Sequence, residues 1–263
     1  MNGVDVRLPG NALELNASQH LGRAPGGGSG AQLYKVAEDD QIYVVKLKGT
    51  AQGIRVLFNE YVSGRIGEMI GVPFGDHALI TVPDALLPPP GEPNIISREP
   101  GKQFGTIYYE NAQSDLLQLR AALNYSKFPS VVVFDTFILR GNGRQYLVYP
   151  SVEEQNAPRD TGGIFDQGYA FTGQPSWTAA SLGAQGDCVA NNGLSLKNDF
   201  NDFAAYEPYV ELLEGMTTTQ LTDIVSEAPL LEWLVTQEEA DTLTAWLSAR
   251  KSLVRRAIED YLR

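Results

Sequence analysis

Residues 24–49 read APGGGSGAQLYKVAEDDQIYVVKLKG, and this stretch decides the fold. On either side of the Glu-Asp-Asp segment at residues 38–40, apolar and polar residues alternate, which is the period of a half-buried β-strand. Two such runs joined by a short polar turn predict a β-hairpin. A glycine-rich segment, residues 26–30, comes shortly before the first strand, and Lys46 lies on the second.

The segments that follow the hairpin add one helix and one strand. Apolar residues at helical spacing predict a helix over residues 55–70, which stops before Gly71 and Pro73. The run HALITVP, residues 77–83, predicts a strand. The proline-rich residues that come next cannot continue it, because proline lacks the backbone N–H that a strand needs, so we expect a surface loop there.

Further along, the chain changes from strand-like to helical patterns. Short strand-like runs lie between residues 94 and 109, and residues 114–124 have a helical pattern. The apolar run SVVVFDTFILRG, residues 130–141, fits either a helix or a strand, since short apolar runs do not separate the two. Two more β-like pieces follow at residues 145–150 and 162–171.

The remainder, from residue 200 onward, is predicted to be helical. The last helix has the clearest start, because Thr236 and Glu239 have the spacing of a capping box. A β-rich N-terminal part with one helix, followed by a helix-rich C-terminal part, predicts an α+β fold. The order has no sequential βαβ units, so we do not expect a doubly wound parallel sheet.

The charge of the chain excludes one class of partner. Its 263 residues include 20 Lys and Arg against 32 Asp and Glu, which gives a formal net charge of −12. A protein that binds nucleic acid needs clustered cations to displace counterions, so we expect no nucleic-acid partner, and anionic membrane surfaces are disfavoured for the same reason. Fourteen acidic residues and one basic residue, Lys197, lie between residues 160 and 249, mostly on faces expected to be solvated.

Cysteine content and hydropathy indicate the compartment. Cys188 is the single cysteine, so no internal disulfide can form. The N-terminus does not resemble a signal peptide, and no apolar stretch is long enough to span a bilayer. We therefore expect a cytoplasmic protein that is not embedded in a membrane.

Three features of the N-terminal part could together bind phosphate groups. Residues 26–30 have no bulky side chains, so backbone N–H groups could approach phosphate oxygens closely. Lys46 could neutralise the phosphates, and Glu60, fourteen residues further along, could orient the lysine. Taken singly, residues 26–30 could be a flexible linker, Lys46 an edge-strand lysine and Glu60 an exposed helix residue. The order in which the three occur favours the functional interpretation.

Two aspartates of the second half are candidates for chemistry. Asp166 follows an apolar run and precedes Gln167-Gly168, a tight turn that would present the carboxylate to a Mg²⁺ ion. The alternative is an ordinary turn aspartate. Asp135 sits inside the apolar run of residues 130–141, where we expect a structural hydrogen bond. Two histidines and one cysteine do not suffice for a zinc site.

The order of these motifs resembles that of the HipA-like kinase family, from about residue 26 to residue 171. LFNEYVSGRIGEMIGVP, residues 57–73, resembles that family's helix with an Asn-Glu pair, and VVVFDTFIL, residues 131–139, resembles its Phe-Asp helix. IFDQGYAF, residues 164–171, resembles its metal-binding segment. The resemblance implies a bilobal protein-kinase-like fold, with an N-lobe over residues 1–98 and a C-lobe over residues 99–263.

The resemblance also implies roles for individual residues. ATP and Mg²⁺ would be the cofactors, Lys46 would bind the nucleotide phosphates, Glu60 would orient Lys46, and Asp166 would hold the metal. The phosphates would be covered by the glycine-rich residues Gly27, Gly28, Ser29 and Gly30.

The catalytic loop departs from the family pattern. Family members have a motif like Asn-x-Asp-Arg-x-x-x-Asn after the Phe-Asp helix, whereas residues 139–146 of this chain read LRGNGRQY and contain no acidic residue. Asn142 is the nearest counterpart of the catalytic aspartate, and Gln145 of the metal-binding asparagine. An amide cannot take up a proton as a carboxylate can, so phosphoryl transfer would be slowed while nucleotide binding could be retained.

The resemblance leaves two main hypotheses for the function. The first is a HipA-like serine/threonine kinase that transfers a phosphoryl group from ATP to an unidentified protein or to itself. The second is an inactive pseudokinase that serves as a nucleotide-binding interaction module. A third, weaker hypothesis treats the acidic C-terminal half as a docking surface or nucleic-acid mimic on a kinase-like scaffold.

Overall fold

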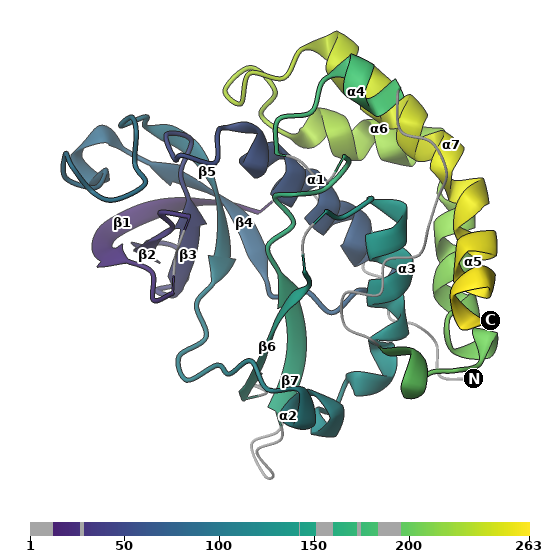
Figure 1. Cartoon of the computed structure of the whole chain (residues 1–263). Coiled ribbons are helices and arrows are strands. Elements are labelled where there is room, and N and C mark those ends of the chain that lie inside the picture. Colours follow the sequence, from purple (N-terminus) through teal and green to yellow (C-terminus); the bar gives the residue numbers. More distant parts are fainter. Residues whose placement is uncertain (1–12, 27–28, 142, 151–159, 173–174, 184–195) are drawn as a thin grey trace.

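The computed structural model describes residues 13–26, 29–141, 143–150, 160–172, 175–183 and 196–263 (Figure 1). A five-stranded barrel forms the N-terminal part, and helices with a two-stranded sheet form the remainder. This arrangement confirms the mixed α+β class, with strands first and helices later, and no doubly wound sheet is present among the described residues.

The barrel strands pair in the order β1-β2-β3-β5-β4, and a parallel pairing of β1 with β4 closes the sheet. The strands are β1 Glu14–Arg23, β2 Gln32–Val36, β3 Ile42–Lys46, β4 His77–Val82 and β5 Gly101–Ile107. Side chains from all around the barrel fill its interior, and Tyr34, Tyr43 and Val45 are among the most buried of them. The barrel is therefore a packed scaffold with apolar contents.

The hairpin predicted from residues 32–49 is confirmed as β2 and β3, with Gln32 opposite Val45 and Lys35 opposite Ile42. Strand β1 has no counterpart among the elements predicted from the sequence. Only Leu15 and Ala17 of β1 are buried apolar residues, and register shifts around residues 17–22 break its period of two. A strand with so few inward apolar side chains gives little signal in the sequence.

Helix α1, Arg55–Met69, matches the helix predicted over residues 55–70. It lies between the barrel and the C-terminal helices (Figure 1), and all its residues except Arg55 and Glu68 are buried. Burial on every side explains why polar residues such as Asn59 and Glu60 lie inside the protein, where they need hydrogen-bond partners.

Strand β5 is the last strand of the barrel in the sequence. It begins after residue 98, where the sequence predicted the boundary between two lobes, and it pairs with both β3 and β4. The barrel thus extends to Ile107. Of the strand-like runs between residues 94 and 109, the first contributes only a bridge between Thr50 and Ile95. The division into lobes itself stays a prediction.

The ambiguous apolar run of residues 130–141 forms a helix as far as Phe137. Helix α3 spans Pro129–Phe137, with proline in its first turn, where the missing N–H is tolerated, and every one of its residues is buried. Because all its faces are covered, its sequence lacks the polar stripe that distinguishes a surface helix from a buried strand.

The C-terminal part contains one two-stranded sheet and several helices besides α3. Strands β6, Gln145–Pro150, and β7, Asp160–Phe165, pair antiparallel along their whole length. The α-helices are α2 Leu116–Ala121, α4 Ala179–Gly183, α5 Glu207–Gly215, α6 Thr218–Glu227 and α7 Gln237–Leu262. Short 3₁₀ turns in this part are η2 Tyr125–Lys127, η3 Leu196–Asn198 and η4 Phe203–Ala205, while η1 Asp84–Leu86 lies in the barrel between β4 and β5.

Helix α7 begins at the predicted capping box, in which Thr236 and Glu239 each accept a hydrogen bond from the other's backbone N–H. Apolar side chains of α7 join one large core that includes α1, α3, α5 and α6. Trp177 and Trp233 are among its largest buried side chains. None of the described helices is long and apolar enough to cross a membrane.

Candidate active site

Lys46, Glu60 and Asp166 form one cluster at the junction of the barrel, α1 and β7. Lys46 ends strand β3, and its ammonium group forms ion pairs with Glu60 on α1 and with Asp166 just after β7, the latter at 2.5 Å. Strand β3 is flanked by β2 and β5, so Lys46 is not an edge-strand lysine. Glu60 is 3% exposed, so it is not an exposed helix residue either. Both alternatives left open by the sequence are wrong.

The charged groups of this cluster shift one another's pKa values. Burial lowers the pKa of Lys46, but Glu60 and Asp166 together outweigh burial and raise the pKa above its ordinary value. Burial raises the pKa of Asp166, yet Lys46, with smaller contributions from Glu60 and Arg140, outweighs burial and the net pKa is lowered. Burial has the larger effect on Glu60 and raises its pKa. Lys46 and Asp166 are thus both charged near neutral pH.

Asp166 occupies a turn with unusual backbone geometry. Its φ is 63°, a left-handed conformation that non-glycine residues adopt rarely. The following residues, Gln167 and Gly168, donate backbone N–H groups to the two carboxylate oxygens of Glu60 at 2.7 and 3.0 Å. Glu60 therefore holds the lysine and the aspartate turn at the same time.

Gln145, which the resemblance gave as the counterpart of a metal-binding asparagine, lies next to Asp166. Its side-chain Nε2 donates to Asp166 Oδ2 at 2.7 Å. A carboxylate and an amide oxygen are hard ligands suited to Mg²⁺, which usually keeps several waters and takes substrate phosphates as further ligands. The pair therefore fits Mg²⁺, while no cluster of three or more His, Cys, Asp and Glu was found among the described residues.

The glycine-rich segment is only partly within the described residues. Gly27 and Gly28 lie outside them, and Ser29 and Gly30 lie in the turn between β1 and β2. Gly30 has a φ of 82°, and a Cβ there would come within 3.2 Å of Asn94, so the position favours glycine. In the part of the chain that the structure describes, Ser29 and Gly30 make no hydrogen bond or ion pair with Lys46, Glu60 or Asp166.

Asn142, the counterpart of the catalytic aspartate, also lies outside the described residues. An arginine stands two residues away on each side of it, and both arginines have defined partners. Arg140 donates to the backbone carbonyl of Asp166 at 3.0 Å. Arg144 pairs through two nitrogens with Asp135 on α3 and donates to the side-chain oxygen of Gln167 at 2.8 Å.

The Arg144–Asp135 pair was missed by the sequence reasoning, which assigned Asp135 a structural hydrogen bond without naming its partner. Both side chains are buried, at 0% and 3% exposure. Burial lowers the pKa of Arg144 to about 9, so the guanidinium stays charged at neutral pH. An aspartate inside an apolar helix needs a hydrogen-bond or ion-pair partner, and that need was the available signal.

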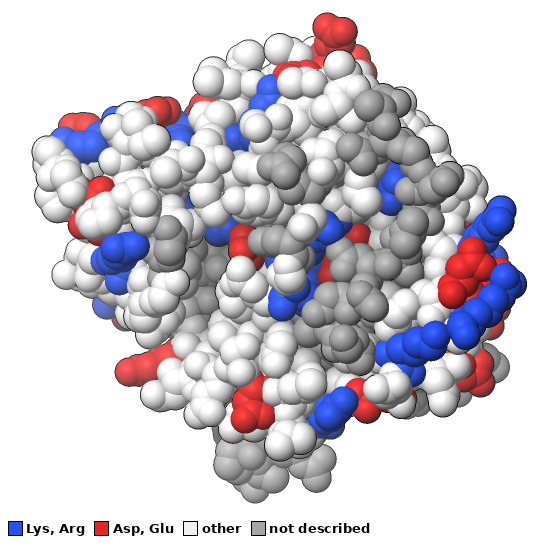
Figure 2. Space-filling model, in the orientation of Figure 1, with Lys and Arg blue, Asp and Glu red and all other residues white. Residues whose placement is uncertain are grey.

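Charges of both signs are mixed on the molecular surface. Figure 2 shows acidic and basic atoms interspersed on the face that it presents, with both kinds near its centre. Several carboxylates of the acidic second half pair with cations of the N-terminal part, namely Glu227 with Arg65, Glu232 with Lys48, and Glu239 with Arg55. These ion pairs join the N-terminal part of the chain to the C-terminal part.

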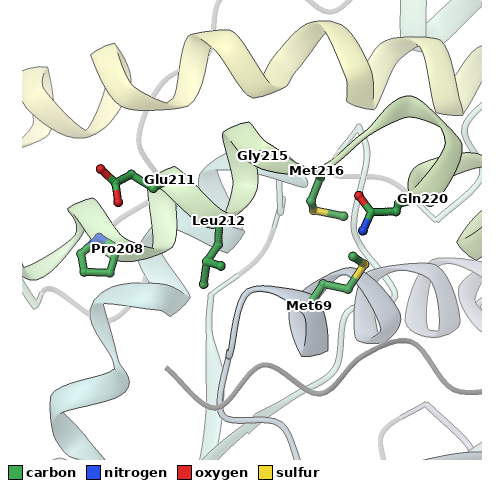
Figure 3. Close-up of a pocket in the computed structure, with 7 residues that line it drawn as sticks. All are labelled: Met69, Pro208, Glu211, Leu212, Gly215, Met216 and Gln220. Carbon is green, nitrogen blue, oxygen red and sulfur yellow. The ribbon is translucent and has the colours of Figure 1, made fainter. Parts of the chain in front are cut away.

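A separate cavity of about 520 Å³ lies at the C-terminal end of α1. Figure 3 shows Met69 of α1 facing Met216 and Gln220. Met216 directly follows α5, and Gln220 belongs to α6. Its lining contains none of the predicted site residues, so the cavity is not part of the Lys46 cluster.

Comparison with known proteins shows what part of this chain is similar to. A family model described as HipA-like kinase matches residues 26–147, which include Lys46, Glu60 and Gln145 but end before Asp166. No curated protein matches the chain.

A solved structure extends the likeness to almost the whole chain. The crystal structure of a Helicobacter pylori proinflammatory kinase, CtkA, is similar with a TM-score of 0.52 and 14% sequence identity. The match covers 96% of this chain and 99% of that chain. At this identity the likeness establishes a shared fold alone. Together with the family match, it confirms the resemblance to HipA-like kinases that the sequence predicted, over residues 26–147.

Proposed function

We propose that the protein binds ATP with Mg²⁺ and acts as a HipA-like kinase, transferring the γ-phosphoryl group to a serine or threonine of a protein or of its own chain. The observation that carries this proposal is the meeting of Lys46, Glu60 and Asp166, three residues in kinase order whose side chains converge on one ion-paired cluster. The barrel would be the N-lobe and the helical part the C-lobe.

Each residue has a defined task in this proposal. Lys46 neutralises the nucleotide phosphates, and Glu60 keeps its ammonium group in place. Asp166 and Gln145 hold the metal, which when bound screens the charge of the phosphates. The phosphates are covered by the backbone of Gly27, Gly28, Ser29 and Gly30.

In the transfer, the acceptor hydroxyl oxygen forms a bond to the γ-phosphorus while the bond to the β,γ-bridging oxygen breaks and ADP leaves. The hydroxyl proton passes to water or to a phosphate oxygen, since Asn142 cannot accept it. Because the transition state is largely dissociative, positioning and electrostatics supply most of the rate. Loss of a general base slows the step by about 10²–10⁴-fold.

A pseudokinase is the second candidate, and the Arg144–Asp135 pair favours it. Asp135 is the carboxylate of α3 nearest to the catalytic loop in the sequence, and its two oxygens are both engaged by Arg144. It is therefore not available as a substitute base. In this case nucleotide binding would regulate contact with a protein partner without turnover.

Two measurements test the proposal. ATP and Mg²⁺ should raise the melting temperature of the wild type but not of Lys46→Ala, whereas Lys35→Ala, on the same hairpin, should respond as the wild type does. Incubation with γ-labelled ATP should then give label that disappears in Asp166→Ala. A thermal shift without label supports the pseudokinase, and no shift with any nucleotide overturns both candidates.

A further inference from the structure

Helix α1 contacts the Asp166 turn through a second side chain besides Glu60. Asn59, which is fully buried, donates from Nδ2 to the backbone carbonyl of Gly168 at 2.8 Å. Glu60 accepts the N–H of the same residue. Both backbone polar groups of Gly168 are thus held by two consecutive residues of one helix.

The close approach of the turn to α1 depends on the glycine. A Cβ at position 168 would come within 2.8 Å of Val56 Cγ1, so any larger residue would push the turn away from the helix. The turn is also held in the left-handed conformation of Asp166, which the chain does not favour by itself. Contacts from outside the turn are needed to maintain this geometry, and Asn59 and Glu60 supply them.

Trp177 fixes the orientation of the Asn59 amide. Its indole Nε1 donates to Asn59 Oδ1 at 2.7 Å. Because the indole can only donate and the Gly168 carbonyl can only accept, the amide nitrogen must point to Gly168. The tryptophan ring is itself fixed by Phe58 and Phe171, at centroid distances of 5.8 and 6.2 Å.

We propose that Asn59, oriented by Trp177, is a positioning residue that holds the 166–168 turn so that the Asp166 carboxylate is presented to the metal–nucleotide complex. The proposal rests on the function proposed above for Asp166. It assigns to Asn59 an effect on metal affinity that is separate from the binding of nucleotide by Lys46.

The first test uses Asn59→Leu, which is close in shape and carries no charge, with Trp177→Phe as a second variant that keeps the ring and loses the N–H donor. Ser63→Ala is the matched control. Ser63 is fully buried one turn further along α1, and its hydroxyl has no hydrogen-bond partner among the described residues. Its removal should leave the turn unchanged.

The readout is the ATP-dependent rise in melting temperature, first with EDTA and then with increasing Mg²⁺. We expect the Mg²⁺ concentration at half-effect to rise by about 10–100-fold in Asn59→Leu, as for other residues that orient a metal ligand. The effect of ATP in EDTA should be unchanged, and Trp177→Phe should show a smaller rise. A folded Asn59→Leu protein with the Mg²⁺ requirement of the wild type would overturn the proposal, as would an equal rise in Ser63→Ala.

The second test needs no nucleotide, so it separates this inference from the proposed function. In hydrogen–deuterium exchange of the free protein, the amides of Gln167 and Gly168 should exchange faster in Asn59→Leu and Trp177→Phe than in the wild type, while those of α7 keep their rates. If the wild type does not respond to ATP, the proposed function fails and this exchange measurement alone decides. Unchanged exchange at residues 167 and 168 overturns the role of Asn59.

Discussion

Lys46 Nζ lies 2.5 Å from Oδ1 of Asp166, although 120 residues separate the two in the chain. The contact joins the end of barrel strand β3 to the turn after β7. Because Lys46 also pairs with Glu60, a single ammonium group is the shared partner of two carboxylates. The electrostatic balance of the site therefore depends strongly on this one side chain.

Replacing Lys46 should destabilise the fold as well as abolish the nucleotide response. Lys46→Ala leaves the Glu60 and Asp166 carboxylates close together without their shared cation, and removing one partner of a buried ion pair costs about 3–5 kcal/mol. Urea denaturation at pH 7 measures the loss.

The control for this prediction is Lys35→Ala. Lys35 pairs with Asp40 on the surface, and an exposed pair contributes at most about 1 kcal/mol. Equal losses of stability in the two alanine variants would contradict the assignment of Lys46 to a buried cluster.

Breaking the Arg144–Asp135 pair should cost more than removing it completely. Either Asp135→Leu or Arg144→Met leaves one buried charge without its partner, with an expected loss of about 3–5 kcal/mol. The double variant Asp135→Leu/Arg144→Met should recover most of this loss, since no isolated charge remains inside. A double-mutant cycle by urea denaturation measures the coupling; additive losses would show that the two residues act independently.

Acid should destabilise the protein through His77. Burial lowers the pKa of His77 below its ordinary value, although Glu68 opposes this shift. The unfolded chain therefore binds a proton near pH 6.5 while the folded protein does not, so stability is complete above that pH and falls as the pH decreases through 6.5. In His77→Gln this part of the pH dependence should disappear.

Denaturation curves collected between pH 8 and 5 measure the effect of His77. His20→Gln, on β1, provides the comparison, because His20 is the other of the two histidines in the chain. A pH dependence that persists unchanged in His77→Gln would exclude buried His77 as its source.

Restoring a carboxylate in the catalytic loop should accelerate phosphoryl transfer. If Asn142 occupies the position of the catalytic aspartate, Asn142→Asp should raise the rate of label transfer, with an upper range of about 10²–10⁴-fold. Asn142→Gln, which keeps an amide, should not do so. ATP affinity from thermal shifts should be similar in the wild type and both variants. An unchanged rate in Asn142→Asp would contradict the assignment of Asn142 to the position of the catalytic aspartate.

Much of the fold was predictable because its signals are local. The β2–β3 hairpin alternates with a clean period of two around a polar turn, and α7 begins with a capping box that is complete in four residues. Strand β1 was not predictable, because the parallel pairing with β4 that closes the barrel depends on residues more than sixty positions away. Its own bulged sequence has little apolar content.

The main residues of the site could be predicted from the sequence, but the hydrogen bonds that hold them in place could not. The order of Lys46, Glu60 and Asp166 indicated a shared role, and the structure places their side chains in contact. The link between Asn59 and Gly168 was not predicted, since neither residue type has a distinctive spacing for this contact. Buried polar networks are determined by tertiary packing, which periodicity along the chain does not encode.

The closure of the barrel by β1 has a consequence for shortened forms of the protein. With β1 in place, each of the five strands has a neighbour on both sides. A fragment that begins at β2 would leave the backbone N–H and C=O groups of β2 and β4 unpaired, and such rows serve as templates for strands of other molecules. We expect that fragment to polymerise at concentrations at which the whole chain remains dispersed.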